Sequence, residues 1–247
     1  MNLRIDDYTY FKKKIKDLLG IDLDGYKDEQ IKRRVGVLMN RIGAKDFISF
    51  YKAIENDPQL RKDFIDKVTI NVSEFFRNPE QFELLKDKII PGLIDRFGSV
   101  KIWSAGCSYG NEPYSAAIIL DELKIKNFTL LATDIDDEAL YKAKEGIYKI
   151  EELKGISQER MSRYFLKLDE TRYKIVDSIR LSVKFNRLDL LRDLYPKGMH
   201  LILCRNVIIY FTQEAKEYVF KNISESLTAG GLLFLGNTER IFNPRSL

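Results

Sequence analysis

The chain has 247 residues, 45% of them apolar, which is enough to form one large or two modest hydrophobic cores. Its 41 basic and 37 acidic residues give a net charge of +4, and a balance this even does not by itself indicate a nucleic-acid partner. No apolar run approaches the roughly 20 residues of a membrane-spanning helix, and the polar start of the chain lacks the apolar region of a signal peptide. We therefore expect a globular protein of the cytoplasm that does not insert into membranes.

Metal and disulfide chemistry have few possible ligands in this chain. Cys107 and Cys204 are the only cysteines, and His200 is the only histidine. Two cysteines are too few for a disulfide scaffold or a zinc site, so we expect no metal and two reduced thiols. His200 directly precedes an apolar stretch, which favours a packing role for it.

The first 72 residues show apolar side chains at helical spacing and no strand-like alternation. Asp57 followed by Pro58 is typical of a helix start, while Gly20 and Gly43 are typical helix ends. The sequence therefore predicts an N-terminal helical domain over residues 1–72. Its four apolar stripes lie within residues 8–19, 31–42, 47–54 and 60–68.

Beyond residue 98, short apolar segments alternate with helical ones, which predicts an α/β domain over residues 73–247 with a parallel, doubly wound sheet covered by helices on both faces. Gly230 and Gly231 are expected to turn the last helix into the last strand. The expected strands are 100–103, 129–133, 200–204 and 231–235, and the expected helices are 113–123, 137–145 and 213–227.

Residues 147–187 interrupt this alternation. Residues 173–176 and 179–185 alternate with period two on either side of Asp177 and Ser178, which predicts an exposed hairpin. Residues 157–168 have the spacing of a helix. We interpret the whole segment as a small antiparallel β-subdomain inserted into the α/β domain.

Two glycines, Gly106 and Gly110, occupy a loop of small residues between the first apolar strand and the helix after it, and Asp134 ends the next strand 28 positions after Gly106. Glycines let the backbone approach a ligand, and a carboxylate at the next strand end accepts both ribose hydroxyls of a nucleoside. The glycine spacing is not the GxGxxG of dinucleotide sites. The pattern therefore favours a nucleoside cofactor without phosphate groups.

Four segments in order carry a family resemblance: INVSEFFR at 70–77, GNEPYS at 110–115, ATDID at 132–136 and CRNVIIYF at 204–211. Together they resemble the chemotaxis receptor methyltransferases of the CheR type, over almost the whole chain. The resemblance implies an N-terminal helical domain, a methyltransferase sheet and a small antiparallel subdomain. It also implies transfer of a methyl group from S-adenosylmethionine to glutamate side chains on the cytoplasmic coiled-coil helices of chemoreceptors, with S-adenosylhomocysteine as the product. We expect a monomer with no nucleic-acid partner.

The resemblance also implies roles for residues at matching motif positions. Asp134 would hold the ribose, Glu112 would lie near the amino-acid end of the cofactor, and the pair Asp189 and Leu190 would contact adenine. Gly106 would let the backbone approach the cofactor. The residues expected along the cofactor and substrate cleft are Asn71, Ser73, Arg77, Arg205, Asn206 and Tyr210.

Three features depart from the family pattern. Asp189 replaces the usual amide, although a carboxylate can still accept a hydrogen bond from the adenine amino group. Asn111 stands where a first glutamate is common. The chain stops at residues 243–247, before the final strand that the family would have, which indicates either a shortened chain or a sheet that ends early.

The expected chemistry needs positioning more than acid–base catalysis. A glutamate carboxylate is already ionised at neutral pH, with a reference pKa of about 4.3, so attack on a sulfonium methyl group needs no general base. Arg77 is the expected clamp on one carboxylate oxygen, with the Tyr210 hydroxyl as a second donor. A purely structural alternative is that Arg77 pairs with Glu74 or Glu80 and that Tyr210 is a core aromatic.

Lys27, Arg34 and Arg41 recur every seven residues and so share one face of the second predicted helix, beside Lys32 and Arg33. A basic face would attract an acidic receptor helix, although such a face is ordinarily just solvated. We expect these residues to bind the substrate.

Asp134 has a structural alternative as well, because it could simply cap the helix that follows.

Two other functions remain possible at this point: methylation of a substrate such as RNA, and non-catalytic sensing of S-adenosylmethionine or its product. The sequence shows no nucleic-acid module, and the presence of Arg77 and Tyr210 disfavours a sensor. No glycine-bearing turn surrounds Asp177 and Ser178, which favours independence from a receptor C-terminal tether peptide.

Overall fold

The computed structural model describes residues 6–69, 71 and 73–240, and the chain divides into two compact units. The helical unit comprises Met1–Ile70 and Ile208–Val219, and the sheet unit comprises Asn71–Val207 and Phe220–Leu247. Residues 243–247, where the chain stops before the expected final strand, lie outside the described residues. Within the described part of the chain, no helix is long and apolar enough to cross a membrane.

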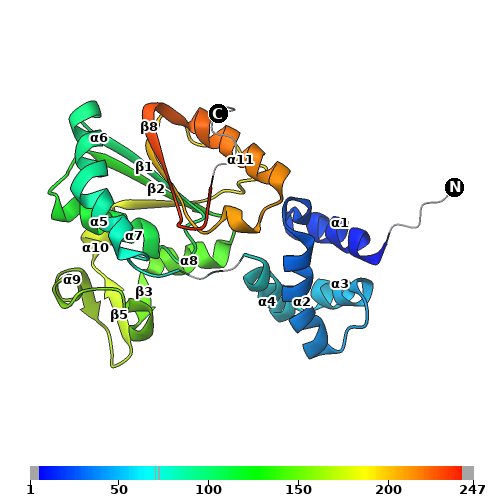
Figure 1. Ribbon diagram of the computed structural model, residues 1–247. Helices are drawn as coiled ribbons and strands as arrows, with labels where there is room; N and C mark the ends of the chain where they lie inside the picture. Colours follow the sequence, from blue (N-terminus) through cyan, green and yellow to red (C-terminus); the bar gives the residue numbers. More distant parts are fainter. Residues whose placement is uncertain (1–5, 70, 72, 241–247) are drawn as a thin grey trace. The chain divides into compact units, whose positions relative to one another are not determined.

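The helical unit contains the four helices that the apolar stripes predict (Figure 1). The Asp6 carboxylate accepts hydrogen bonds from the backbone of the first helix, and Asp57 caps the fourth as expected. The aromatic rings of Phe11, Phe50 and Phe64 pack together in the core of this unit, with centroid separations of 5.7–6.2 Å. The helices are α1 (Asp7–Leu19), α2 (Asp28–Ile42), α3 (Phe47–Asn56) and α4 (Pro58–Thr69).

A distant segment completes the helical unit. Tyr26 and Phe211 form an antiparallel bridge with ring centroids 5.1 Å apart, and the backbone nitrogen of Lys27 donates to the carbonyl of Tyr210 over 3.0 Å. Phe211 is 3% exposed and is therefore a core aromatic of this unit. Tyr210 is thereby held beside the start of α2.

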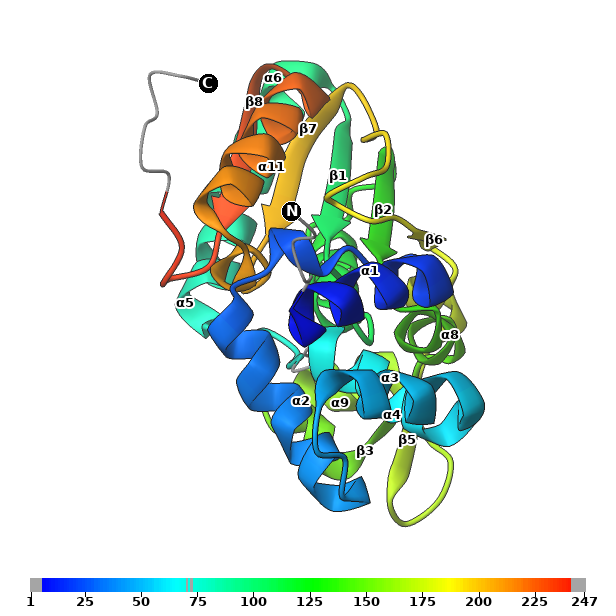
Figure 2. The same ribbon diagram turned by 90° about the vertical axis from the view of Figure 1, so that its right-hand side faces the viewer.

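The sheet unit is built on five parallel strands in the order β6-β2-β1-β7-β8 (Figures 1 and 2). The strands predicted at 100–103 and 200–204 are therefore neighbours. The strands are β1 (Val100–Ala105), β2 (Phe128–Asp134), β6 (Val183–Arg187), β7 (Met199–Cys204) and β8 (Leu227–Leu235). The α/β class is confirmed.

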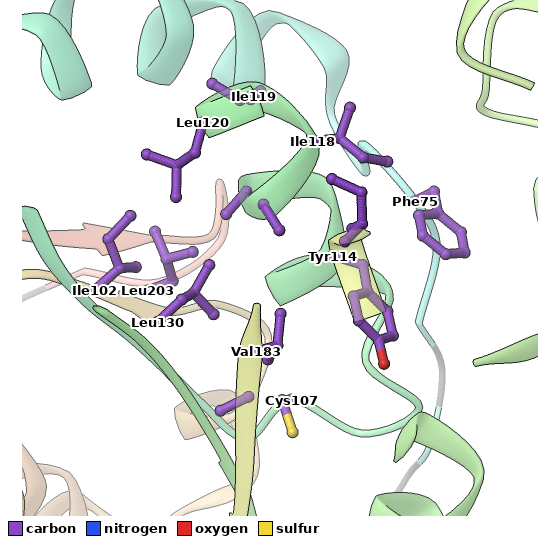
Figure 3. Close-up of a cluster of buried hydrophobic side chains, with 14 of the residues drawn as sticks. Phe75, Ile102, Cys107, Tyr114, Ile118, Ile119, Leu120, Leu130, Val183 and Leu203 are labelled. Carbon is purple, nitrogen blue, oxygen red and sulfur yellow. The ribbon is translucent and has the colours of Figure 1, made fainter. Parts of the chain in front are cut away.

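The helices of this unit bury the sheet. Strands that are covered on both faces are apolar almost throughout. Figure 3 shows Leu120 of α7 (Asn111–Glu122) on the side of Ile102 of the sheet and Ile118 of the same helix on the side of Phe75, all in one core cluster. Further helices of this unit are α5 (Pro79–Leu84), α6 (Ile90–Phe97) and α8 (Asp137–Glu145), and the second half of α11 (Gln213–Ser226) also belongs to it.

A second, antiparallel sheet of three strands has the order β3-β5-β4, which confirms a small antiparallel subdomain. Its strands are β3 (Ile147–Lys149), β4 (Phe165–Lys167) and β5 (Arg172–Ile175). Residues 157–168, predicted as one helix, form α9 (Gln158–Tyr164) and then β4.

The predicted hairpin around Asp177 and Ser178 is wrong. Asp177–Arg180 forms the short helix α10, and the strand after it, β6, pairs in parallel with β2 of the large sheet. Alternation with period two located β5, but only residues 183–185 of the second predicted strand lie in β6. Alternation indicates that one face of a strand is buried and not which strand lies beside it. The antiparallel partners of β5 are instead β3 and β4.

The last strand begins earlier than expected. It starts at Leu227, and its pairing with β7 shifts in register between Met199 and Leu201. Gly230 has a φ of +80°, which suits an irregular stretch inside the strand. The two glycines therefore lie within β8 and do not form the turn before it.

Candidate active site

The predicted cofactor residues converge because parallel strands end at the same edge of a sheet. Gly106 follows β1, Asp134 ends β2, Asp189 follows β6, and Arg205 follows β7. Since β1 lies between β2 and β7, the loops that carry these residues are neighbours. All of the predicted cofactor residues belong to the sheet unit.

Asp134 is 8% exposed, and backbone groups fix its carboxylate. One oxygen accepts from the nitrogen of Ser108 at 2.7 Å and the other accepts from the nitrogen of Asp136 at 3.0 Å. Burial raises the pKa of Asp134 to about 6, although these hydrogen bonds lower it. The cap of α8 is Asp136, whose side chain accepts from Glu138 and Ala139, so the capping role that we considered for Asp134 belongs to Asp136.

Asn71 links the two loops at this edge. Its amide nitrogen donates to a carboxylate oxygen of Asp136 at 2.7 Å, and its amide oxygen accepts from the hydroxyl of Ser108 at 3.0 Å. Asn71 thus bridges the loop after β1 and the loop after β2. An amide serves here because it donates with one atom and accepts with the other.

The glycines are required by close approach and by conformation. Gly106 has a φ of +78°, and a Cβ on it would lie 2.4 Å from a methyl carbon of Val207. Gly110 has a φ of +84°, and a Cβ there would lie 3.0 Å from the Cβ of Ala143. Any larger residue would therefore distort the loop that precedes α7.

Arg205, which is buried, forms an ion pair with the partly buried Glu112. A guanidinium nitrogen of Arg205 lies 3.3 Å from one carboxylate oxygen of Glu112, and the hydroxyl of Ser104 donates to the other at 2.8 Å. Burial raises the pKa of Glu112, an effect that Arg205 opposes. The pair lies where the resemblance places the amino-acid end of the cofactor.

Arg205 has more partners than its predicted role as a cleft wall suggests. It is 6% exposed and donates to the carbonyl of Arg77 at 2.6 Å, to the side-chain oxygen of Asn78 at 3.0 Å and to that of Gln81. Arg205 therefore fixes the backbone next to Arg77 while it holds Glu112. The side chains of Arg77 and Ser73 are half-buried.

Asp189 has a carboxylate oxygen that is buried and lacks a hydrogen-bond partner among the described residues. The other oxygen accepts from the nitrogen of Leu191 at 2.8 Å. Leu190 is 7% exposed, and its carbonyl accepts from the hydroxyl of Tyr195. An orphaned acceptor beside an apolar side chain suits the amino group and the flat face of an adenine.

The substrate-side predictions fall in the helical unit, where each residue has an internal contact. The Nζ of Lys27 donates to the carbonyl of Ile209 at 3.0 Å. Arg34 donates to the carbonyl of Lys67 at 3.3 Å, and its guanidinium lies 5.1 Å from the centre of the Tyr210 ring.

Arg41 forms an ion pair with Asp63. The three basic residues and Tyr210 thus share one unit, while Arg77 belongs to the other.

Cys107 and Cys204 follow β1 and end β7 as expected, and neither forms a disulfide. They are 1% and 0% exposed, and burial raises the pKa of both thiols well above its usual range. His200 stacks on Phe97 at 4.3 Å, in agreement with a packing role. No group of side chains suited to a metal ion occurs among the residues that the structure describes.

Sequence reasoning missed several residues that shape this site. Ser104 and Gln81 hold the Glu112–Arg205 pair, and Glu239 binds the backbone after β7. None lies in a motif with a recognised spacing. Their contacts depend on strand order, which the sequence pattern does not specify.

The site fits an adenosyl cofactor. Asp134 would bind the ribose, Asp189 and Leu190 the adenine, and Glu112 the amino group of the methionine part. Phosphate groups would face the carboxylates of Glu112 and Asp134 at this edge, which is electrostatically unfavourable. A sulfonium cofactor without phosphate suits these charges.

Comparison with known proteins agrees with this geometry. Residues 71–247 match the CheR methyltransferase SAM-binding domain, and residues 6–69 match the all-alpha domain of CheR methyltransferases. The chain is 40% identical over 240 residues to a chemotaxis protein methyltransferase of Listeria monocytogenes, covering 96% of this chain and 91% of that protein. It is also 34% identical to chemotaxis protein methyltransferase 1 of Pseudomonas aeruginosa, over 96% of this chain and 91% of the relative.

The likeness extends to enteric bacteria. The chain is 34% identical to the chemotaxis protein methyltransferase of Escherichia coli, over 89% of this chain and 79% of that protein. Both family matches together cover nearly all of the sequence. The chain belongs to the CheR family of S-adenosylmethionine-dependent methyltransferases.

Proposed function

We propose that the protein transfers a methyl group from S-adenosylmethionine to glutamate side chains of a chemoreceptor cytoplasmic domain, forming glutamate methyl esters and S-adenosylhomocysteine. The observation that carries the proposal is the family match over both domains, joined to an edge of the sheet with an orphaned acceptor at Asp189 and a buried ribose acceptor at Asp134. The enzyme would act in the cytoplasm as a monomer on coiled-coil receptor helices.

The chemistry suits the residues that are present. When bound, the cofactor supplies an electrophilic methyl group on a sulfonium. The glutamate carboxylate attacks without a general base, so the chain needs only to orient it and to exclude water. In agreement with this, none of the residues predicted to bind the cofactor or the attacking glutamate is a histidine or a lysine.

Arg77 is the proposed group that holds the attacking glutamate. Arg77 would bind one carboxylate oxygen through a charge-assisted hydrogen bond, which leaves the other oxygen to attack. Support for this comes from the loop around Arg77, whose backbone Arg205 anchors at 2.6 Å. The guanidinium would therefore start from a fixed backbone, which reduces the entropy lost on binding. We assign Ser73 and Asn206 to the same cofactor and substrate cleft.

The basic face of α2 is the proposed site of attraction for receptor helices. Lys27 and Arg34 donate to neutral carbonyl groups, so their positive charges remain. Arg41 faces the carboxylate of Asp63, which offsets its charge. Steering depends on net charge and not on free donors, so we assign the larger share to Lys27 and Arg34. On this basis residues 1–72 would serve recognition, and residues 73–247 would serve methyl transfer.

A transfer assay with labelled methyl groups tests the proposal. The purified protein is incubated with labelled S-adenosylmethionine and either a receptor cytoplasmic fragment with its methylatable glutamates or the same fragment with glutamines there. We expect label only in the glutamate fragment. Equal labelling of both fragments, or labelling of RNA in place of either, would refute the glutamate acceptor.

A further inference from the structure

Glu239, in the segment after β8, has a carboxylate that collects three backbone N–H groups. One oxygen accepts from the nitrogens of Asn206 at 2.8 Å and of Gly236 at 2.9 Å, and the other accepts from the nitrogen of Val207 at 3.0 Å. The residue is 8% exposed. A buried carboxylate with three such donors is held firmly, and it holds its donors equally firmly.

The backbone that Glu239 binds has an unfavourable conformation. Asn206 has a φ of +60°, in the left-handed region that non-glycine residues rarely adopt. Such a residue persists only where its surroundings impose the conformation. Two of the three bonds to Glu239 come from this residue and from the next one, Val207.

The segment Asn206–Val207 touches both halves of the cofactor site. Val207 lies against Gly106, where an added Cβ would come within 2.4 Å of it, and two residues later Ser108 donates to Asp134. On its other side the segment continues from Arg205, which holds Glu112. One carboxylate therefore supports the residues that would bind the ribose and those that would bind the amino-acid end.

Gly236 provides independent support. Its backbone does not have a positive φ, so glycine is not needed there for conformation. A Cβ at this position would instead lie 2.8 Å from a carboxylate oxygen of Glu239 and 3.3 Å from the nitrogen of Asn206. The absence of a side chain is what lets the carboxylate reach the backbone.

We infer that Glu239 is a positioning residue for the cofactor: through the backbone of Asn206 and Val207 it sets the loops that carry Asp134 and Glu112. The inference rests on the family's cofactor and is independent of which acceptor is methylated. An amide cannot replace the carboxylate, because its nitrogen would face a backbone donor. Cofactor binding would thus depend on Glu239, a residue outside the recognised motifs.

Calorimetric titration with S-adenosylhomocysteine, without any acceptor, tests the inference. We expect Glu239→Gln to weaken binding about tenfold, which corresponds to about 1.4 kcal/mol, and Gly236→Ala to weaken it by a similar factor. Glu225→Gln is the matched control, since Glu225 is exposed and its ion-pair partner in the described part of the chain is Lys197, at 3.4 Å. The control should bind as the parent protein does.

Stability is measured on the same variants to separate positioning from folding. A positioning role predicts weaker binding at temperatures where circular dichroism shows every variant fully folded, and partial recovery in Glu239→Asp. Binding within twofold of the parent protein in both folded variants would overturn the inference. So would a loss in Glu225→Gln equal to that in Glu239→Gln. If Glu239→Gln does not fold, Gly236→Ala and Glu239→Asp decide the matter alone.

Discussion

The acidic residues at the edge of the sheet and the basic residues on α2 illustrate different limits of inference from sequence. Asp134 is buried and Glu112 is partly buried, and backbone or side-chain donors fix their carboxylates. Lys27 and Arg41 are exposed, and each contacts a group that the sequence did not indicate. Strand topology determines what surrounds a residue at a strand end, whereas helical periodicity shows only which residues share a face. The difference teaches that position in a motif predicts environment, while spacing on a helix predicts orientation alone.

The largest effect is expected at Arg77, which combines a motif position with a half-buried side chain and so tests the comparison most strongly. Arg77→Ala should lower turnover by about a hundredfold or more, because it removes both the orientation and the charge that hold the carboxylate. Arg77→Lys should recover only part of the rate, since a point charge lacks the planar fork. Steady-state kinetics with a receptor fragment measure both.

Thermal unfolding provides the control for Arg77. A residue that serves the substrate leaves the melting temperature nearly unchanged when it is replaced. Near-normal transfer together with a sharply lowered melting temperature would make Arg77 a structural ion-pair residue, and Tyr210 would remain as the candidate that holds the glutamate.

Asp134 comes next in expected effect. Asp134→Ala should weaken S-adenosylhomocysteine binding at least tenfold, because each charge-assisted hydrogen bond contributes about 1.5–3 kcal/mol. Asp189→Asn is the milder comparison: one acceptor oxygen remains for the adenine amino group, while the amide nitrogen would face the nitrogen of Leu191, so affinity should fall by less than in Asp134→Ala. Calorimetry that finds unchanged affinity in Asp134→Ala would remove this residue from the site.

The raised pKa of Asp134 makes cofactor affinity depend on pH. Its folded-state pKa of about 6 lies above the ordinary 3.8, because burial disfavours the charged form. Ribose hydroxyls donate to the ionised form and so lower this pKa on binding. Affinity should therefore rise up to about tenfold per pH unit as the pH increases towards 6, and stay constant above it.

The same titration on Asp134→Asn checks the assignment. The dependence between pH 5 and 6 should disappear in this variant, which has no carboxyl group at that position. A flat profile in the parent protein, or an unchanged slope in the variant, would show that another group titrates.

The smallest effects are expected for substitutions of the basic residues at α2. Lys27→Gln removes an unbalanced charge and should raise the receptor KM about two- to fivefold at low salt and weaken its salt dependence. Arg41→Gln should change the KM less, because Asp63 already offsets its charge. Equal effects of the two substitutions would contradict the role that we give to net charge, and no effect of either would favour a merely solvated face.

Much of the fold follows from the sequence, for physical reasons. The helix α8 has the predicted bounds, 137–145, because an aspartate cap precedes it and Gly146 in the left-handed region ends it. The predicted hairpin failed because alternation does not name the partner of a strand. Local signals therefore located the elements, and tertiary contacts decided how two of them pair.

The candidate site likewise contains residues that local sequence signals predict and residues that only tertiary contacts explain. Asp134 and Gly106 could be found because a strand end and a close approach restrict the residue type. Glu239 could not, because its carboxylate matters only once β7 and β8 are neighbours. The thiols show a related limit: their placement at the edge was correct, but their complete burial means that slow alkylation is expected with or without cofactor.

The central claim, that the methyl group is transferred to a carboxylate, is tested most directly by the chemical stability of the product. An ester of glutamate hydrolyses in mild alkali and releases the label as methanol, whereas methylated nitrogen, sulfur or nucleic-acid bases keep it. We expect all of the label transferred to a receptor fragment to be released as volatile methanol after alkali treatment. Label that stays bound to the acceptor would contradict the claim.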